Sequence, residues 1–216
     1  MKIFPAIFCC LVFITTFSFA QKKDKKAQEI LDGVSAKYKS YKSVQADFVL
    51  KAEAAQTNMT DQQAGTLYVR GDKYKIELKD QDIISDGKTM WTYVRKANEV
   101  QVNSVDPGDE ETMTPNQIFT IYEKNFLYAY IEDQKVNGKT LQIIDLTPND
   151  KSKPYSKIRL AIDQASKTIQ SAALFNRNGN RYTYEIKKFT ADPAISDDLF
   201  TFNKANYPGV EVNDLR

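Results

Sequence analysis

The main pattern in the chain is a two-residue alternation of apolar and polar side chains. Over residues 73–79, for example, Tyr74, Ile76 and Leu78 alternate with lysine and glutamate. Such alternation predicts β-strands with one apolar face. It returns in further segments, which lie at residues 43–50, 67–69, 90–94, 100–102, 141–143, 158–162 and 182–186. The chain is therefore predicted to be mainly β.

Turn signals separate several of these segments. The pairs Asp86-Gly87, Asn137-Gly138 and Asn178-Gly179 lie between apolar runs, and such pairs favour the tight turns that join antiparallel strands. The polar, short-sided stretch from Ala52 to Gln63 is expected to be a hairpin loop. The sequence thus predicts an antiparallel meander that is rolled into a barrel or a sandwich.

Two segments have helical spacing instead. From Asp24 to Tyr41 apolar residues recur every three or four positions, which places them on one helix face; they are Ala27, Ile30, Leu31, Val34, Tyr38 and Tyr41. A second helix is expected from Thr114, with Pro115 at its first position; its apolar residues are Ile118, Phe119, Ile121, Tyr122 and Phe126. Two such helices can cover one face of the sheet, and the pattern leaves open whether they enclose a cavity or an ordinary core.

The first 20 residues differ in composition from the rest. Lys2 precedes an apolar stretch from Ile3 to Phe19, and a lysine-rich run follows Ala20 at once. This order is typical of a secretory signal peptide. A membrane-spanning helix is the alternative, but it needs about 20 predominantly apolar residues. We expect export to the periplasm, cleavage after Ala20, and a single domain over residues 21–216.

Cysteine and histidine usage excludes most catalytic chemistry. Both cysteines, Cys9 and Cys10, lie within the signal segment, and the chain has no histidine. Ile7 and Phe8 precede Cys9, where a lipid-modified cysteine would need small residues, so lipidation is not expected. Triads, Cys–His dyads and most zinc sites are therefore excluded. Only carboxylate, lysine, tyrosine or Ser–Lys chemistry remains.

The remaining candidate motifs favour simpler interpretations. Residues 87–89 (Gly-Lys-Thr) resemble the end of a phosphate-binding loop, but the glycine required five residues earlier is Asp82. Carboxylates such as Asp80 and Glu110 fall in predicted loops, where a solvated charge is the ordinary explanation. A formal net charge of +2 provides no attraction to nucleic acid.

Three segments carry a more specific pattern. The first is Gly-Thr-Leu-Tyr-Val-Arg at 65–70, followed by Tyr-Lys-Ile at 74–76. The second is Ile-Ser-Asp-Gly-Lys-Thr-Met-Trp-Thr-Tyr at 84–93. The third is Phe-Thr-Phe at 200–202 with Pro-Gly-Val-Glu-Val at 208–212. In order and spacing they resemble the LolA family of periplasmic lipoprotein carriers.

The resemblance implies both a fold and a function. The fold is an unclosed antiparallel β-barrel, that is, a strongly curved sheet covered by lid helices. The implied function is transport of triacylated lipoproteins from an ABC transporter of the inner membrane to an outer-membrane acceptor. It implies no enzymatic activity, no metal and no cofactor. We expect a monomer without a nucleic-acid partner.

The implied cargo site is an apolar cavity between sheet and helices. We expect its wall to be formed by apolar strand residues, namely Leu67, Val69, Tyr74, Ile76, Leu78, Trp91 and Tyr93. The lid is expected to contribute Tyr38, Ile118, Phe119 and Tyr122. In the family an arginine followed by proline ties the barrel to the lid helices. Arg70 matches that arginine, with Gly71 in place of the proline, and is the candidate lid latch.

Three alternatives remain open at this stage. A periplasmic sensor of the same fold would bind lipoprotein or glycolipid, but such relatives usually carry a second domain. An outer-membrane acceptor would itself be lipidated. A hydrolase would require paired carboxylates that face inward from strands.

Overall fold

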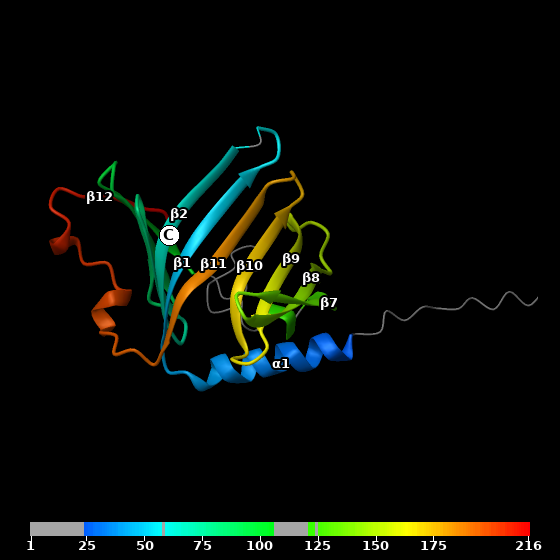
Figure 1. Ribbon diagram of the computed structural model, residues 1–216. Helices are drawn as coiled ribbons and strands as arrows, with labels where there is room; N and C mark the ends of the chain where they lie inside the picture. Colours follow the sequence, from blue (N-terminus) through cyan, green and yellow to red (C-terminus); the bar gives the residue numbers. More distant parts are fainter. Residues whose placement is uncertain (1–23, 58, 106–120, 124) are drawn as a thin grey trace, which may run out of the picture.

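The computed structural model describes residues 24–57, 59–105, 121–123 and 125–216. Within them, twelve strands form one sheet that curves strongly and does not close (Figure 1). The strand order is β12-β6-β5-β4-β3-β2-β1-β11-β10-β9-β8-β7. The predicted unclosed barrel is confirmed, with one α-helix, α1, among the described residues. The signal segment 1–20 and the lid residues Ile118 and Phe119 lie outside them.

The first half of the sheet is a meander of six antiparallel strands. Their bounds are β1 Val44–Ala54, β2 Met59–Arg70, β3 Lys73–Leu78, β4 Gln81–Ser85, β5 Thr89–Val94 and β6 Glu99–Ser104. The Asp86-Gly87 turn joins β4 and β5 as predicted, with Gly87 at a positive φ of 91°. β1 and β2 extend through most of the stretch from Ala52 to Gln63 that was expected to be a loop. Pairing with β1 holds residues 59–63 of β2 in strand conformation, and Ala52 and Glu53 of β1 pair with β11 as well.

The second half is a meander that returns to the first. Its strands are β7 Phe126–Val136, β8 Lys139–Pro148, β9 Tyr155–Asp163, β10 Thr168–Asn176 and β11 Arg181–Ala191. The predicted Asn-Gly turns join β7 to β8 and β10 to β11. β11 pairs with β1, so β1 is the junction of the two meanders. Phe126, expected in the second helix, begins β7 instead and lies against Pro148 of β8.

The chain ends in a segment that crosses the outer side of the first meander. It contains the short helices η3 (Asp197–Phe200) and η4 (Lys204–Asn206) and ends in β12 (Glu211–Asp214). β12 pairs in parallel with β6, the exception to the antiparallel pattern. We call residues 192–210 the strap. In Figure 1 it runs past the side of the sheet that faces away from α1.

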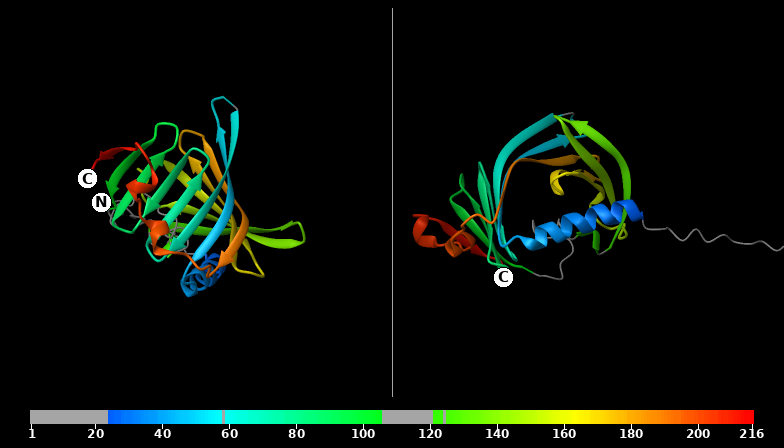
Figure 2. Two further views of the ribbon diagram at one scale, coloured as in Figure 1. Left: turned by 90° about the vertical axis from the view of Figure 1, so that its left-hand side faces the viewer. Right: turned by 60° about the horizontal axis from the view of Figure 1, so that its bottom comes forward.

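The helix α1 (Lys25–Ser40) crosses the opening of the curved sheet (Figure 2). Its predicted apolar stripe is buried on the inner side, with Ala27, Leu31, Val34 and Tyr38 between 0% and 8% exposed. They pack with inner residues of β7 to β10 in one core, which includes Ile144, Leu146, Ile158, Leu160 and Ala172. In the described ranges, no helix has both the length and the apolar character needed to cross a membrane.

Charged side chains cover the outer face of the second meander. Arg159 donates to both carboxylate oxygens of Asp145, at 2.6 and 2.8 Å. The Phe175 ring lies between Lys157 and Arg181, with the Lys157 Nζ 4.6 Å from its centroid. These ion pairs and cation–π contacts let this face meet water without a further layer.

Asp24 fixes the start of α1 and also joins it to the sheet. Its Oδ1 accepts a hydrogen bond from the Ala27 N–H at 3.1 Å, and its Oδ2 accepts one from the Tyr130 N–H of β7 at 2.8 Å. These backbone donors, Tyr130 first, lower the pKa of Asp24. The carboxylate is therefore both a helix N-cap and an anchor.

We expect Asp24→Ala to lower the free energy of unfolding by about 1–2 kcal/mol, because cap and anchor are lost together. Since the native pKa is lowered, this stabilisation is present above the ordinary aspartate pKa of about 3.9 and is lost as the pH falls through the native value. Urea unfolding from about pH 7 to about pH 3 should show the difference from wild type shrinking. Glu29→Ala, which removes an exposed carboxylate of α1, is the control. A pH-independent difference would contradict this role.

Candidate functional site

Strand register decides which side chains share the inner face with α1. Directly opposed residues of antiparallel strands point to the same side. Val69 lies opposite Tyr74, and Leu67 lies opposite Ile76. Leu78 lies opposite Gly65, in the same row as Phe48. The structure therefore brings five of the predicted wall residues together on the inner face, namely Leu67, Val69, Tyr74, Ile76 and Leu78.

Trp91 and Tyr93 lie on the opposite face, which corrects their placement in the wall. Ser85 shares the inner side with Tyr74 and pairs with Met90 of β5. The side chains of Met90, Thr92 and Val94 therefore point inward, and those between them point outward. The prediction assumed one apolar face for β5, whereas both faces of this strand are apolar because the strap covers the outer one.

The outward aromatic residues belong to a second, outer core. The Tyr93 ring lies 4.5 Å from the Tyr207 ring and 6.1 Å from the Phe202 ring, centroid to centroid. Phe200 of the strap has no exposed surface. Val100 and Val102 of β6 are also buried on this side, opposite Tyr93 and Trp91. The Phe-Thr-Phe segment of the sequence is thus a structural anchor of the strap.

Arg70 is tied to the strap and lies on the outer face. Its guanidinium donates to the Ile195 carbonyl oxygen at 2.9 Å and pairs with the Asp197 carboxylate. It also lies 5.2 Å from the centroid of the Phe200 ring. Lys73 pairs with the same carboxylate at 3.0 Å, and the bonds from Lys73 and the charge of Arg70 lower the pKa of Asp197. These contacts make Arg70 a latch for the strap, which corrects its assignment to the lid.

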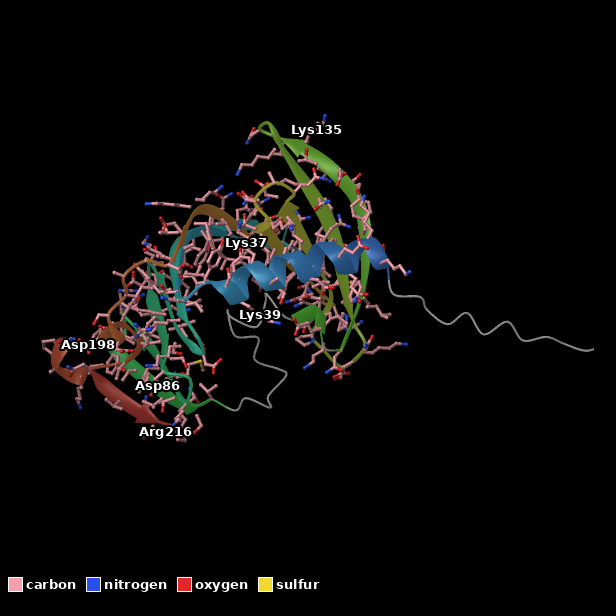
Figure 3. All side chains as sticks on the ribbon, turned by 90° about the horizontal axis from the view of Figure 1, so that it is seen from below. Lys37, Lys39, Asp86, Lys135, Asp198 and Arg216 are labelled. Atoms are coloured by element: carbon pink, nitrogen blue, oxygen red, sulfur yellow. The ribbon has the colours of Figure 1, made fainter. Side chains whose placement is uncertain are left out.

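Hydrogen bonds fasten α1 to the rest of the molecule along its length. Asp32 accepts a hydrogen bond from the Tyr122 hydroxyl at 3.0 Å, so the predicted lid residue Tyr122 does lie under α1. The Tyr38 hydroxyl accepts one from the Ile169 N–H of β10 at 3.3 Å in the core. Ser35 and Lys39 both donate to Glu123, at 3.0 and 2.7 Å. Figure 3 shows Lys37 and Lys39 on the two flanks of the helix.

Apolar contacts hold α1 more strongly than these bonds. Burial of a leucine or valine side chain stabilises by about 1.5–3 kcal/mol. For Ala27, Leu31, Val34 and Tyr38 together, detachment would cost roughly 5–8 kcal/mol. A cost near 7 kcal/mol would leave about one molecule in 10⁵ with α1 detached. The helix is therefore a fixed element of the unliganded molecule.

The ends of β1, β2, β3 and β11 that point away from α1 carry apolar side chains that remain accessible. Phe48 and Leu50 of β1 lie opposite Ile186 and Tyr184 of β11. The Phe48 and Tyr184 rings are 5.9 Å apart; Tyr184 is 37% exposed, whereas Phe48 itself is buried. We call this surface the open face; it comprises half-buried or exposed inner residues, namely Leu50, Leu67, Ile76, Leu78, Tyr182, Tyr184 and Ile186.

Gly65 gives the open face its shape. A Cβ on Gly65 would lie 2.6 Å from Phe48 Cζ and 2.8 Å from Leu78 Cδ2. It would also lie 2.8 Å from the carbonyl oxygen of Glu77. Only glycine lets the Phe48 ring lie directly on the β2 backbone. This explains physically why a glycine opens the Gly-Thr-Leu segment.

Sequence reasoning missed the part of the open face that comes from β1 and β11. The pattern was present in the sequence, because Leu50 and Ala52 alternate with the charged residues Lys51 and Glu53, and Tyr182, Tyr184 and Ile186 alternate with polar ones. What the alternation could not provide was the pairing of β1 with β11 across about 140 residues of chain. Only that pairing places both runs beside Gly65.

Cavities lined by described residues lie on the outer side. One of about 480 Å³ lies beneath the strap, and its floor is a single cross-strand row made of Gln45, Tyr68, Lys75 and Ile84. Another of about 320 Å³ lies at the tip of the β1–β2 hairpin. Both are lined by mixed polar and apolar groups. Neither adjoins the predicted wall residues on the inner face.

The sequence has relatives of known family. Residues 39–203 match the family model described as "Outer membrane lipoprotein carrier protein LolA". An outer-membrane lipoprotein carrier protein of Histophilus somni (strain 2336) is 25% identical over 175 residues, which cover 79% of this chain and 80% of the relative. The corresponding protein of Pasteurella multocida (strain Pm70) is 26% identical with the same coverage.

A solved structure shares the fold. An uncharacterized conserved protein from Thermus thermophilus superposes with a TM-score of 0.58 over 88% of this chain and 99% of its own. The sequences are 11% identical, so the likeness concerns the fold alone.

We expect Gly65→Ala to lower the free energy of unfolding by about 1–3 kcal/mol, because Phe48, Leu78 and the Glu77 carbonyl must all shift. Gly33→Ala is the matched control. Its Cβ would lie 3.4 Å from Lys167 Cδ, an ordinary contact, and alanine in the middle of a helix should stabilise by about 0.5–1 kcal/mol. Opposite shifts of the urea midpoint would support the close contact at Gly65. Equal shifts would argue against it.

Removal of the Arg70 side chain should loosen the strap. We expect Arg70→Ala to accelerate amide hydrogen exchange over residues 195–207, because it removes the bond to Ile195, the pair with Asp197 and the cover of Phe200. Lys73→Ala removes only one ion pair to Asp197 and should have a smaller effect. Unchanged exchange in Arg70→Ala would mean that aromatic packing alone holds the strap.

Proposed function

Because the chain belongs to the LolA family of outer membrane lipoprotein carrier proteins, we propose that it binds the acyl chains of triacylated lipoproteins on its inner face. It receives them from the ABC transporter of the inner membrane and delivers them to an outer-membrane acceptor. The family is periplasmic and its carriers are not enzymes. The substrate is thus transported without chemical change.

The observation that carries this proposal is the segregation of charge along β1. The inner residues Phe48, Leu50 and Ala52 are apolar, whereas the outer residues between and beside them include Lys51 and Glu53. On the outer side the Arg181 guanidinium and the Lys51 ammonium lower the pKa of Glu53 to about 2. The residues directly opposite Phe48 and Leu50 on both neighbouring strands carry no carboxylate or amine. This part of the inner face suits an uncharged, flexible hydrocarbon.

The energetics suit a carrier. Transfer of an acyl chain from water to an apolar surface gains about 0.8 kcal/mol per methylene, or roughly 12 kcal/mol for a sixteen-carbon chain. The competing environment is the bilayer, which solvates the chain about as well. The carrier therefore only needs to exclude water during transit. Loading against the bilayer requires outside energy, which an ATP-driven donor supplies.

The same proposal describes the mature protein after export. Removal of segment 1–20 after Ala20 releases residues 21–216 as a single carrier domain and a monomer. Cys9 and Cys10 are removed with the signal segment, so the protein is not held at a membrane by a lipid on its own N-terminus. A freely diffusing carrier, and not a membrane-bound acceptor, results. A lipidated N-terminus in a membrane fraction would instead indicate the acceptor.

We expect Ile76→Glu to abolish release of lipoprotein from inner-membrane vesicles that contain the transporter. The carboxylate would face the acyl chain in an apolar setting, at a cost of several kcal/mol. Val49→Glu is the matched control, because Val49 is half-buried on the outer face of β1. Mass spectrometry of protein purified from the periplasm should identify bound acyl-protein. Lipid without protein would favour a glycolipid sensor, and normal release by Ile76→Glu would contradict the proposed binding face.

A further inference from the structure

The two ends of the inner face differ in how they are covered. Near α1 the strands are sealed by the helix stripe and by hydrogen bonds at Asp32, Ser35 and Tyr38. At the far ends of β1, β3 and β11 the open face remains accessible, with Tyr184 the most exposed of its residues. Access for a ligand therefore does not require that the helix leave the sheet.

We infer that acyl chains enter across the Phe48–Tyr184 pair and lie on the open face while α1 stays docked. The inference rests on the proposed function and specifies where on the inner face the cargo binds. In this arrangement α1 is a permanent floor, Leu50 and Tyr184 are the accessible entry residues, and the buried Phe48 ring packs against Tyr184. Movement is confined to side chains at the far strand ends.

The geometry of the entry residues fits a linear hydrocarbon. Gly65 lets the Phe48 ring lie directly on β2, so that Leu78, Phe48 and Ile186 form one apolar row across β3, β2, β1 and β11. The Tyr184 ring lies beside this row, 5.9 Å from the Phe48 ring. The row continues inward through Leu67 and Ile76, which are half-buried against the main core. A chain laid along this path meets apolar surface from the rim to the core.

The hydrogen bonds that fix α1 involve none of the residues of this row. The helix can therefore be crosslinked to the sheet without a change in the entry residues. Gly33 of α1 lies next to Lys167, at the turn between β9 and β10, and a Cβ at Gly33 would be 3.4 Å from Lys167 Cδ. Cysteines at these two positions can be joined by a short thiol-specific crosslinker that reduction cleaves. No other cysteine interferes if Cys9 and Cys10 are replaced by alanine.

The test compares Gly33→Cys/Lys167→Cys protein before crosslinking, after crosslinking and after reduction. The probe is a fluorescent tripalmitoyl-cysteinyl-seryl-lysine peptide, and its affinity is measured by fluorescence anisotropy. We expect the three affinities to agree within about threefold. A loss of about tenfold or more on crosslinking that reduction restores would overturn the fixed floor and leave the proposed function intact. Absence of binding in all three states would overturn both.

The entry is tested separately by one charge on each side of the same strand. Tyr184→Glu places a carboxylate on the open face, and Thr183→Glu places one on the outer face one residue away. We expect Tyr184→Glu to weaken probe binding by about tenfold or more and Thr183→Glu to change it by less than about threefold. Near-ultraviolet circular dichroism verifies that both variants are folded. Equal affinities for the two folded variants would overturn the assignment of the entry residues.

Discussion

The pairing of β1 with both β2 and β11 is the constraint on which the packing of α1 and of the strap depends. It joins two separate meanders into one curved sheet. Because side chains alternate along β1, this one strand sets the inner and outer directions for both halves. A shift by one residue would turn Phe48 and Leu50 outward and bring Asp47 and Lys51 onto the inner face. The contact of Phe48 with Gly65 opposes such a shift, since no other residue of β2 offers a bare backbone there.

An unclosed sheet must protect two faces, and this chain uses a different device for each. On the inner side α1 buries one apolar stripe, and its attachment through Asp24 and Tyr38 is to strands of the second meander. On the outer side the strap seals the first meander with Phe200, and charged rows around Asp145 suffice for the second. Arg70 helps to hold the strap on the outer side. The side chain of this arginine faces away from α1, and its contacts with the strap give it a structural role at the end of β2.

Much of the fold could be predicted from local patterns, because strand alternation and Asn-Gly turns depend on neighbouring residues. The first helix was predicted to within a residue of its observed ends for the same reason. The site was harder, since the face of each strand depends on register that accumulates over successive hairpins. Tyr74 and Ile76 were placed together correctly within one strand. Trp91 and Tyr93 were placed on the wrong side because a distant aromatic segment, near Phe202 and Tyr207, makes their outer face apolar.

A carrier must exchange its cargo with two membranes, and this requirement favours a fixed helix over a moving one. If α1 had to detach, each transfer would pass through a state that exposes both its own stripe and the core beneath Tyr38. That cost would arise at loading and again at release, and it would slow both steps in the absence of a partner. Entry at the far strand ends avoids it, because the residues there are already partly in contact with water. The difference in free energy between loaded and empty states then depends mainly on the acyl chain and the bilayer, so direction can be imposed by the donor and the acceptor.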